Sequence, residues 1–235
     1  MLNSLLSNLP ECELQIITNQ MALVSLPKGQ TLFEMGEVPS HVYFPISAIV
    51  SMLIDMEDGA SIETYMLGNT CMVGAATLGQ PSFYRACVRS AGLAYRMPAQ
   101  AMLNARAKCP VYMQGALAAT HRMFMQLSQA IVCGKRHTIE QQLIRWMLIT
   151  LDRTSDSAIQ ITHQELSEVL GFRREAITLA LGKLTGKGSV QISRGEIVVH
   201  DRAALEACSC ECYWIGQQRK RPVTALDGEA HKRLG

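Results

Sequence analysis

The stretch ITHQELSEVLGFRREAITLALGKL, residues 161–184, predicts two short helices joined by a turn. Thr162 and Glu165 form the pattern of a capping box, in which each side chain accepts a hydrogen bond from the other residue's backbone amide. Gly171 can end the first helix, because a residue without a Cβ adopts a left-handed conformation at little cost. The apolar face of the second helix consists of Ile177, Ala180, Leu181 and Leu184. We therefore interpret the stretch as a helix-turn-helix whose charged triplet, Arg173-Arg174-Glu175, faces outward.

The second helix of such a motif presents its first turns to the major groove of DNA. There an arginine can donate two hydrogen bonds to guanine, and a carboxylate can accept one from the cytosine amino group. We expect the outward-facing residues to contact bases, namely Arg173, Arg174, Glu175 and Thr178. The alternative is a solvated charged turn without a ligand.

The segments on both sides of this motif complete a domain. Thr138 with Gln141 predicts another capping box, which opens a helix that runs to Asp152. Residues 190–199 predict a β-hairpin whose tip displays Arg194, so the motif is expected to be a winged helix. The residues expected to contact backbone phosphates are Thr162, Lys183 and Arg194.

Composition supports a globular protein with an anionic partner. The 235-residue chain is 48% hydrophobic, enough for a sizeable core. Residues 1–134 carry 7 basic and 8 acidic residues, whereas residues 135–235 carry 15 and 12. The positive surplus therefore lies with the predicted helix-turn-helix. The sequence starts without a secretory signal and contains no apolar run of the roughly 20 residues that span a bilayer. We expect a cytoplasmic protein without a membrane partner.

The N-terminal part has the pattern of a β domain. From Met21 to about residue 100, short apolar runs alternate with turn signals, at the spacing of roughly 8 to 12 residues that is typical of sandwiches and barrels. The runs are ALVSL, TLF, VYF, IVSMLI and ETYML, and residues 85–97 supply further strand. Asp58-Gly59 predicts a hairpin turn, and residues 75–78 predict a short helical or irregular segment.

A different period begins at Pro110, which suits the first turn of a helix. Spacings of 4 and 3 form a coiled-coil seam of Met113, Leu117, Thr120, Phe124, Leu127 and Ile131. Gly134 is expected to end this helix, ahead of a polar hinge at residues 135–137. The seam could pack on the β domain of its own chain or pair with a second subunit. We favour the homodimer, because two-fold symmetry places two helix-turn-helix motifs in successive major grooves about 34 Å apart.

The expected fold is α+β. It combines an N-terminal double-stranded, jelly-roll-like β-roll, a long dimerisation helix and a C-terminal winged helix-turn-helix. The expected boundaries are residues 1–109 for the β-roll effector domain, 110–137 for the dimerisation helix and hinge, 138–216 for the winged domain, and 217–235 for a disordered tail.

This order of elements resembles the CRP/FNR family of bacterial transcription regulators, named for the cyclic AMP receptor protein and the fumarate-nitrate reduction regulator. The most specific part is ITHQELSEVLGFRREAI, which follows the family pattern of Thr, Gln-Glu, a small residue, Gly, Arg-Glu and an aliphatic residue. The resemblance implies that Arg174 and Glu175 read base edges and that RNA polymerase is a partner. It also shows two departures: Leu179 stands where the family often has a second base-contacting arginine, and Arg173 replaces a small cap residue. Leu179 could then touch a thymine methyl group.

The effector pocket departs from the family pattern as well. Cyclic-nucleotide binders in the family use a Gly-Glu pair for the ribose hydroxyl and a later Arg-Ser or Arg-Thr pair for the cyclic phosphate. The corresponding residues here are Gly74-Ala75 and Arg85-Ala86. Arg85 could still bind an anion, but the missing carboxylate costs on the order of 1.5 to 3 kcal/mol. We expect an effector other than cyclic AMP, and no cofactor is identifiable.

The eight cysteines do not have the spacing of a secreted disulfide framework. Iron-sulfur members of the resembled family collect cysteines near the N-terminus, where this sequence has Cys12 alone. Cys208, Cys210 and Cys212 form a C-x-C-x-C pattern, which differs from the C-x-x-C metal knuckle. We expect packing and surface thiols and no metal site, with a redox or metal-sensing role of this cluster as an alternative.

The sequence thus predicts a dimeric, sequence-specific DNA-binding regulator that binds a pseudo-palindromic operator under the control of an unidentified small-molecule effector. The alternative is a small-molecule or redox sensing module that acts mainly through protein contacts. We do not expect an enzyme, because the sequence has no nucleophile elbow, P-loop or zinc-protease motif.

Overall fold

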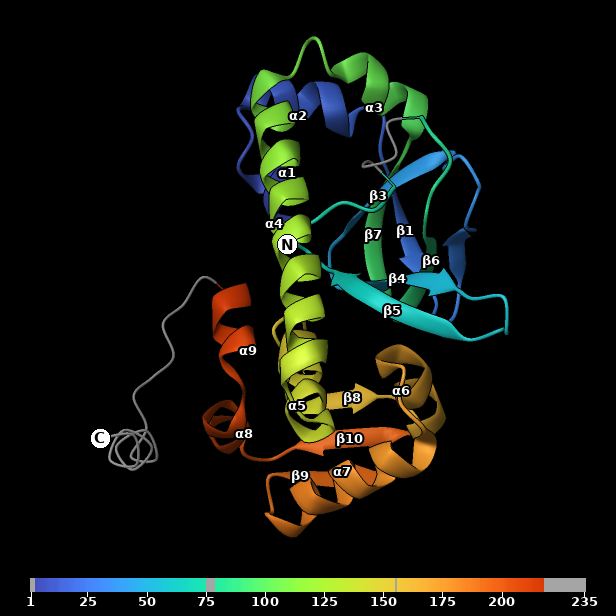
Figure 1. Ribbon diagram of the computed structural model, residues 1–235. Helices are drawn as coiled ribbons and strands as arrows, with labels where there is room; N and C mark the ends of the chain where they lie inside the picture. Colours follow the sequence, from blue (N-terminus) through green and yellow to red (C-terminus); the bar gives the residue numbers. More distant parts are fainter. Residues whose placement is uncertain (1–2, 75–78, 155, 218–235) are drawn as a thin grey trace, which may run out of the picture. The chain divides into compact units, whose positions relative to one another are not determined.

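The computed structural model describes residues 3–74, 79–154 and 156–217, and Figure 1 shows the path of the chain. Two compact units share the chain: Met1–Leu127 with Glu168–Gly171, and Ser128–Ser167 with Phe172–Gly235. The segment 75–78 and the predicted tail beyond Gln217 lie outside the described residues. The elements are a mixture of helices and antiparallel sheets, so the α+β prediction is confirmed.

The first unit contains two antiparallel sheets. Its strands are β1 (Ala22–Leu26), β2 (Thr31–Phe33), β3 (His41–Pro45), β4 (Ile49–Asp55), β5 (Ser61–Leu67), β6 (Arg85–Ser90) and β7 (Gly92–Pro98). One sheet has the order β1-β7-β3 and the other β2-β6-β4-β5. The predicted Asp58-Gly59 turn joins β4 to β5, and Gly59 has a φ of 84° that suits a residue without a Cβ.

A hydrophobic core joins the two sheets of this unit. The four-stranded sheet contributes Phe33, Val50, Met52 and Val88, and the three-stranded sheet contributes Leu26, Tyr43 and Ala94. These side chains alternate along their strands with residues that face the opposite side, as the period of two requires. Because of this alternation, neighbouring residues of β6 face opposite sides of the sheet, and only every second residue can reach the core.

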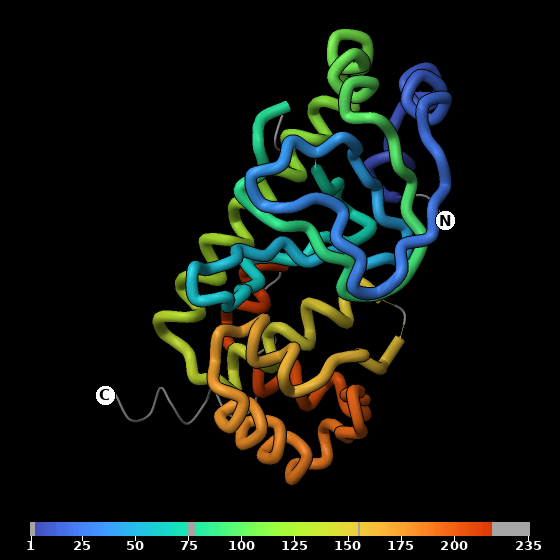
Figure 2. Tube along the Cα trace, turned by 90° about the vertical axis from the view of Figure 1, so that its right-hand side faces the viewer, coloured from blue at the N-terminus to red at the C-terminus, as the bar shows by residue number. Residues whose placement is uncertain are grey.

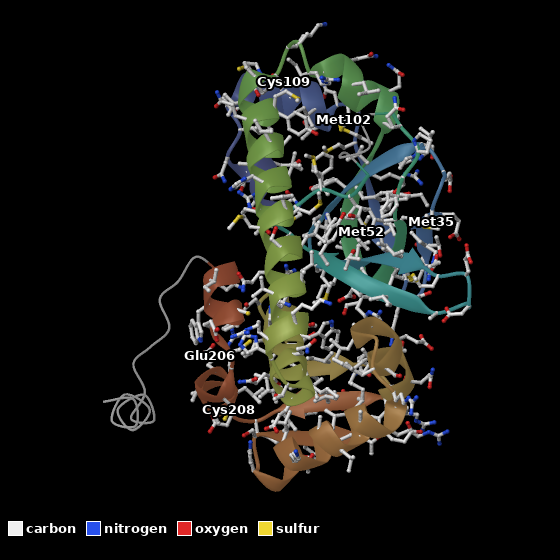
Figure 3. All side chains as sticks on the ribbon, viewed as in Figure 1. Met35, Met52, Met102, Cys109, Glu206 and Cys208 are labelled. Atoms are coloured by element: carbon white, nitrogen blue, oxygen red, sulfur yellow. The ribbon has the colours of Figure 1, made fainter. Side chains whose placement is uncertain are left out.

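Three helices pack on a second cluster at β3 and β7: α1 (Ser4–Ser7), α2 (Glu11–Thr18) and α3 (Ala99–Ala105). Figure 3 labels Met102 of α3 and Cys109 in this region, and both side chains are buried. Glu13 of α2 accepts hydrogen bonds from the backbone amides of Val111 and Tyr112, at 3.0 and 2.8 Å. The buried Glu13 carboxylate therefore binds the first turn of the next helix, where its negative charge is favourable.

The long helix α4 (Pro110–Arg136) begins at the predicted proline but ends later than predicted. Gly134 lies inside the helix, and Lys135 and Arg136 form its last turn. A glycine inside a helix costs about 1 kcal/mol relative to alanine, so one glycine does not stop a helix that its neighbours continue. The expectation that Gly134 ends the helix was wrong, and the hinge is reduced to the residues around His137.

The remaining elements are α5 (Ile139–Leu151), β8 (Ala158–Gln160), α6 (His163–Leu170), α7 (Arg174–Gly186), β9 (Val190–Ser193), β10 (Glu196–Val199), α8 (Arg202–Cys208) and α9 (Glu211–Gly216). Thr138 caps α5 through the predicted capping box with Gln141. The strands form a sheet of order β8-β10-β9. The hairpin β9-β10 could be predicted from its sequence, whereas β8, α8 and α9 were not predicted.

Helices α8 and α9 are anchored on α5 by polar contacts to Asp152, the C-cap residue of α5. The Asp152 carboxylate accepts hydrogen bonds from Arg202 of α8, from the Tyr213 hydroxyl at 3.2 Å and from Gln217. Arg202 also pairs with Glu206, at 2.8 Å. Figure 1 shows α8 and α9 beside α5 and the end of α4.

Among the described residues, none of the helices combines the length and apolarity needed to cross a bilayer.

Candidate functional site

The start of α6 shows the reciprocal cap that its sequence predicted. The Thr162 hydroxyl accepts a hydrogen bond from the Glu165 amide at 3.1 Å, and the Glu165 carboxylate accepts one from the Thr162 amide at 2.7 Å. Each bond satisfies a backbone donor that has no partner within the helix. The first helix of the motif therefore has a defined beginning.

The turn between α6 and α7 is closed by local hydrogen bonds. Gly171 has a φ of 69°, the left-handed conformation that was predicted for it. The Phe172 amide donates to the Ser167 carbonyl at 3.2 Å, and the Ser167 hydroxyl donates to the Phe172 carbonyl. Figure 2 shows the trace of α6 and α7 in orange on both sides of this turn.

Helix α7 separates an apolar face from a charged face. The predicted apolar residues, Ile177, Ala180, Leu181 and Leu184, are all buried. The candidate base-contacting residues, Arg173, Arg174, Glu175, Thr178 and Leu179, are all exposed. Leu179 is 70% exposed, so this apolar side chain has no part in the core. Arg173 is the N-cap residue and makes no side-chain capping bond, which leaves its guanidinium available.

Thr178 has a second contact that the sequence did not indicate. Its hydroxyl donates to the Arg174 carbonyl at 2.9 Å. The hydroxyl oxygen of Thr178 also lies 3.1 Å from the Nδ1 atom of His163. These contacts link α6 to α7, so Thr178 helps to hold the two helices together. Sequence spacing contained no signal for the His163 contact, because the two residues belong to different helices.

The β9-β10 hairpin follows as predicted. Val190 pairs with Val199 and Ser193 with Glu196 across the hairpin, which leaves Arg194 and Gly195 at its tip. Gly195 has a φ of 78°, as a tight turn requires. Arg194 is exposed.

The candidate DNA-contacting cations differ from other cations of the same unit. Lys187 pairs with Glu140 at 2.7 Å, and the pKa of Lys187 is raised by this bond. By contrast, within the described part of the chain no ion pair is formed by Arg173, Arg174, Lys183 or Arg194. Their charges are therefore available to an external anion.

The predicted seam of α4 is divided between buried and exposed residues. Met113 and Leu127 are partly buried and pack against the cores of the first unit. Leu117, Phe124 and Ile131 are 72%, 64% and 67% exposed. These three are spaced by seven residues, and Thr120 between them is also exposed. The alternative was that the whole seam packs on its own chain. The exposure of Leu117, Phe124 and Ile131 argues against it.

A cavity of about 430 Å³ lies in the first unit. It is lined by Phe33, Met52, Tyr65, Leu67, Met72, Gly74, Gln80, Pro81, Ser82, Phe83, Tyr84 and Met123. Met52, labelled in Figure 3, contributes from β4. None of these residues carries a charge at neutral pH. The cavity is therefore suited to an apolar or aromatic ligand.

The four candidate effector residues are not brought together in this cavity. Gly74 lines it, whereas Ala75 lies outside the described residues. Ala86 is fully buried in the core between the sheets, so the neighbouring Arg85 faces the other side of β6. There Arg85 donates to both carboxylate oxygens of Asp55, at 2.7 and 2.8 Å. The expectation that Arg85 and Ala86 share one pocket is corrected by this alternation.

The Asp55–Arg85 pair also includes Ser61, whose hydroxyl donates to Asp55 at 2.5 Å. The hydrogen bond from Arg85 lowers the pKa of Asp55 below its usual range, and the bond from Ser61 acts in the same direction. The pKa of Arg85 is raised by the same bond to Asp55. Arg85 therefore has an internal carboxylate partner in place of a ligand phosphate.

The structure divides the C-x-C-x-C cluster. Cys208, labelled in Figure 3 on α8, is exposed, whereas Cys210 and Cys212 are buried. The buried pair lies beside Cys133 of α4, which is far from both in the sequence.

Comparison with known proteins assigns both halves of the chain to described domains. A family model for the Crp-like helix-turn-helix domain matches residues 141–208, and one for the cyclic nucleotide-binding domain matches residues 23–109. The chain is 23% identical over 195 residues to the "Global nitrogen regulator" of Synechococcus elongatus, a match that covers 76% of this chain and 85% of the relative.

Two solved structures have the same fold. FixK2 from Bradyrhizobium japonicum matches with a TM-score of 0.68 at 15% identity and covers 81% of this chain and 98% of its own. A CRP/FNR-family transcriptional regulator from Thermus thermophilus matches with a TM-score of 0.65 at 18% identity and covers 79% and 97%. The sequence predictions of the β-roll, the long helix and the winged domain agree with these matches.

Proposed function

Because the chain belongs to the CRP/FNR family of transcription regulators, we propose that it binds a pseudo-palindromic operator as a homodimer, under the control of a small molecule bound by its β-roll domain. Its helix-turn-helix domain makes it a DNA-binding protein. The observation that carries the proposal is the charged face of α7, where Arg174 and Glu175 are exposed on a helix whose opposite face is fully buried.

The residues of this face have different roles in the proposal. Arg174 and Glu175 lie in the first turn of α7 and read base edges, as the first turns of a recognition helix do. Arg173 and Leu179 extend the readout, Leu179 through contact with a thymine methyl group. Thr178 lies beside them, and its hydroxyl positions the helix through His163.

Phosphate contacts flank the base contacts. Lys183 lies later on α7, Arg194 at the tip of the hairpin and Thr162 at the start of α6. Among the described residues, Lys183 and Arg194 form no ion pair that binding to a phosphate would have to break. Such contacts orient the protein on the duplex without reading its sequence.

The partner in the dimer is a second copy of this chain. Leu117, Phe124 and Ile131 are exposed at intervals of one heptad, and two such helices pair by burying the same residues of both copies. A two-fold axis along α4 also supplies the two DNA-binding motifs that a symmetric operator needs.

The effector of the proposal is an uncharged, apolar or aromatic molecule in the β-roll cavity. Most of the lining is apolar or aromatic, with Gln80 and Ser82 as polar residues, and Arg85 of β6 is bound to Asp55 on the opposite face of its sheet. Neither observation favours a cyclic nucleotide. RNA polymerase is the proposed protein partner at the promoter, by the resemblance to the family.

Selection of bound duplexes from a random pool tests the proposal. We expect a two-fold symmetric motif whose half-sites are centred one helical turn, about 10 to 10.5 base pairs, apart. The matched control is a variant with Arg174→Ala and Glu175→Ala, which should lose the motif but keep weak, salt-dependent binding. If no symmetric motif is recovered with the cavity empty or filled by a screened ligand, the chain acts through protein contacts instead.

A further inference from the structure

Four side chains from distant parts of the second unit converge at one buried point: Cys133, His137, Cys210 and Cys212. Each offers one ligand atom, and these four atoms all lie within 4.8 Å of one another. The three cysteines are nine-tenths or more buried. Sulfur and imidazole nitrogen in this number form the ligand set of a closed, tetrahedral zinc site.

Two of the distances between these atoms match those of a tetrahedral site. The Sγ atoms of Cys133 and Cys210 are 3.8 Å apart, and the Sγ atom of Cys212 is 3.4 Å from Nδ1 of His137. With bonds of about 2.3 Å to sulfur and about 2.0 Å to nitrogen, tetrahedral ligands lie about 3.8 and about 3.5 Å apart. A disulfide would instead need sulfur atoms about 2.05 Å apart. The four atoms thus leave room for an ion at their centre.

His137 is held as a metal ligand usually is. Its Nδ1 atom faces Cys212, and its Nε2 atom lies 3.2 Å from a carboxylate oxygen of Glu211. Ligating histidines commonly donate their second ring N–H to a carboxylate, which orients the ring and leaves the first nitrogen unprotonated for the metal. Glu211 therefore selects the tautomer whose free electron pair faces the cysteines.

A buried cation lies beside the cluster. Arg145 of α5 is close enough to Cys133 to interact electrostatically with its thiol. The Nε atom of Arg145 is buried without a hydrogen-bond partner among the described residues. Its positive charge offsets the excess negative charge of three thiolates around a divalent ion.

The ligands lie on elements that are fixed independently of a metal. Cys133 is on the last turns of α4, and Cys210 is the N-cap residue of α9. The Asp152 contacts hold α8 and α9 on α5 through Arg202 and Tyr213. These contacts help to bring Cys133 and Cys210 together, although the two residues are 77 positions apart in the sequence.

We propose that Cys133, His137, Cys210 and Cys212 bind one zinc ion, which ties the end of α4 and the hinge at His137 to α9. Each cysteine that enters as a thiol releases its proton to solvent and bonds to the ion through the sulfur electron pair. Zinc fits better than a hard cation such as magnesium or calcium, because those ions take oxygen ligands. All four positions are filled by protein atoms, so the site is structural or regulatory rather than catalytic.

Metal analysis of the full-length protein, purified without chelator, tests the site directly. We expect one zinc ion per chain by mass spectrometry and, after exchange, the charge-transfer bands and intense d–d bands of tetrahedral, thiolate-bound cobalt(II). Cys210→Ser and His137→Gln should abolish or strongly weaken both signals. Cys208→Ser is the matched control, because Cys208 belongs to the same C-x-C-x-C run but is exposed, and it should keep both.

A second variant tests the site without removing a ligand. Glu211→Gln should lower the zinc affinity about tenfold in competition with a chelator, near the lower end of the range for outer ligand partners, because Glu211 is 61% exposed. Circular dichroism of each variant shows whether it is folded, and cobalt binding to chelator-stripped wild type provides a measurement that needs no substitution.

Several outcomes would overturn the proposal. These are a folded wild type that neither contains nor takes up zinc or cobalt(II), equal metal loss in Cys208→Ser, a Cys133–Cys210 disulfide in protein saturated with zinc, or the absorption of an iron-sulfur cluster after anaerobic purification. The site does not depend on the proposed DNA-binding function. Zinc bound at one ion per chain in a protein that selects no operator would leave the site intact and refute the regulator.

Discussion

Arg174 and Glu175 are the two exposed residues that we propose to read base edges. Both lie on the first turn of α7, away from the buried face that Ile177 and Leu181 form. Because neither is needed for packing, substitution at these positions changes the ligand-facing surface and leaves the core unaltered. Arg85 shows the opposite case, because its charge is already bound by Asp55.

Arg174→Ala should weaken operator binding by about 1 to 3 kcal/mol, and only at sequences that contain the base Arg174 reads. Arg194→Ala, at the hairpin tip, should weaken binding about equally at all sequences and lower the salt slope by about 1. Binding titrations against single-base operator variants at several salt concentrations measure both effects. A uniform loss for Arg174→Ala would reassign Arg174 to a phosphate.

The Asp55–Arg85 pair should make stability depend on pH in the acid range. The pKa of Asp55 is lowered by Arg85, so the pair stabilises the fold above about pH 4, the usual value for an unfolded aspartate. This contribution is lost as the pH falls below that value and through the folded-state pKa. Asp55→Asn should therefore lower the free energy of unfolding by about 1 kcal/mol at pH 7, and the difference from wild type should shrink toward zero in acid.

Urea unfolding at neutral and acidic pH checks this expectation. Glu57→Gln is the matched control, because Glu57 follows β4 two residues later and its exposed side chain forms no ion pair with another described residue. It should unfold like wild type at both pH values. A deficit of Asp55→Asn that stays constant with pH would show that packing rather than charge is responsible.

Among the elements, those with local signals could be predicted and those held by distant contacts could not. The caps of α5 and α6 are hydrogen bonds between residues three positions apart, Thr138 with Gln141 and Thr162 with Glu165. The start of α4 instead depends on Glu13, which is 98 residues away from Val111. Gly134 was a local signal that gave a wrong prediction. A glycine inside a helix costs only about 1 kcal/mol relative to alanine, and α4 continues through Gly134 to Arg136.

The exposed seam of α4 should hold two copies of the chain together. Leu117→Glu combined with Phe124→Glu places two charges per copy at the centre of the pairing surface, so the dimer should dissociate to monomers. Analytical ultracentrifugation measures the mass. Leu23→Glu with Met56→Glu is the matched control, because both residues are exposed apolar side chains outside α4, at 57% and 52%. If the mass of the α4 variant stays that of wild type, the seam is not the dimer interface.

For the whole molecule, two domains of one family carry different amounts of functional information. The helix-turn-helix exposes the Arg174-Glu175 pair that we propose to read bases, whereas in the β-roll Arg85 is bound internally by Asp55. A shared fold therefore does not imply a shared effector. The apolar cavity favours an apolar or aromatic ligand, and the cluster at the end of α4 is the proposed zinc site.

Cyclic AMP should leave the melting temperature of the protein unchanged up to millimolar concentration. A ligand at about 100 times its Kd would stabilise the folded state by about 2.7 kcal/mol, which a thermal-shift assay detects. Uncharged aromatic and other apolar compounds that fit the 430 Å³ cavity are the comparison set. A saturable rise with cyclic AMP that Arg85→Ala abolishes would show instead that Arg85 leaves Asp55 to bind the phosphate.

The sequence by itself determined the elements whose signals lie within a few residues: the caps, the left-handed Gly171, the β9-β10 hairpin and the apolar face of α7. The helix-turn-helix could be interpreted from these because hydrogen bonds between residues three or four apart form in any chain with that pattern. Only the tertiary structure decided the relations between distant residues, such as the pairing of Arg85 with Asp55 and the gathering of Cys133 and His137 with Cys210 and Cys212. Those depend on strand alternation and on how helices fold back, which spacing along one segment does not encode.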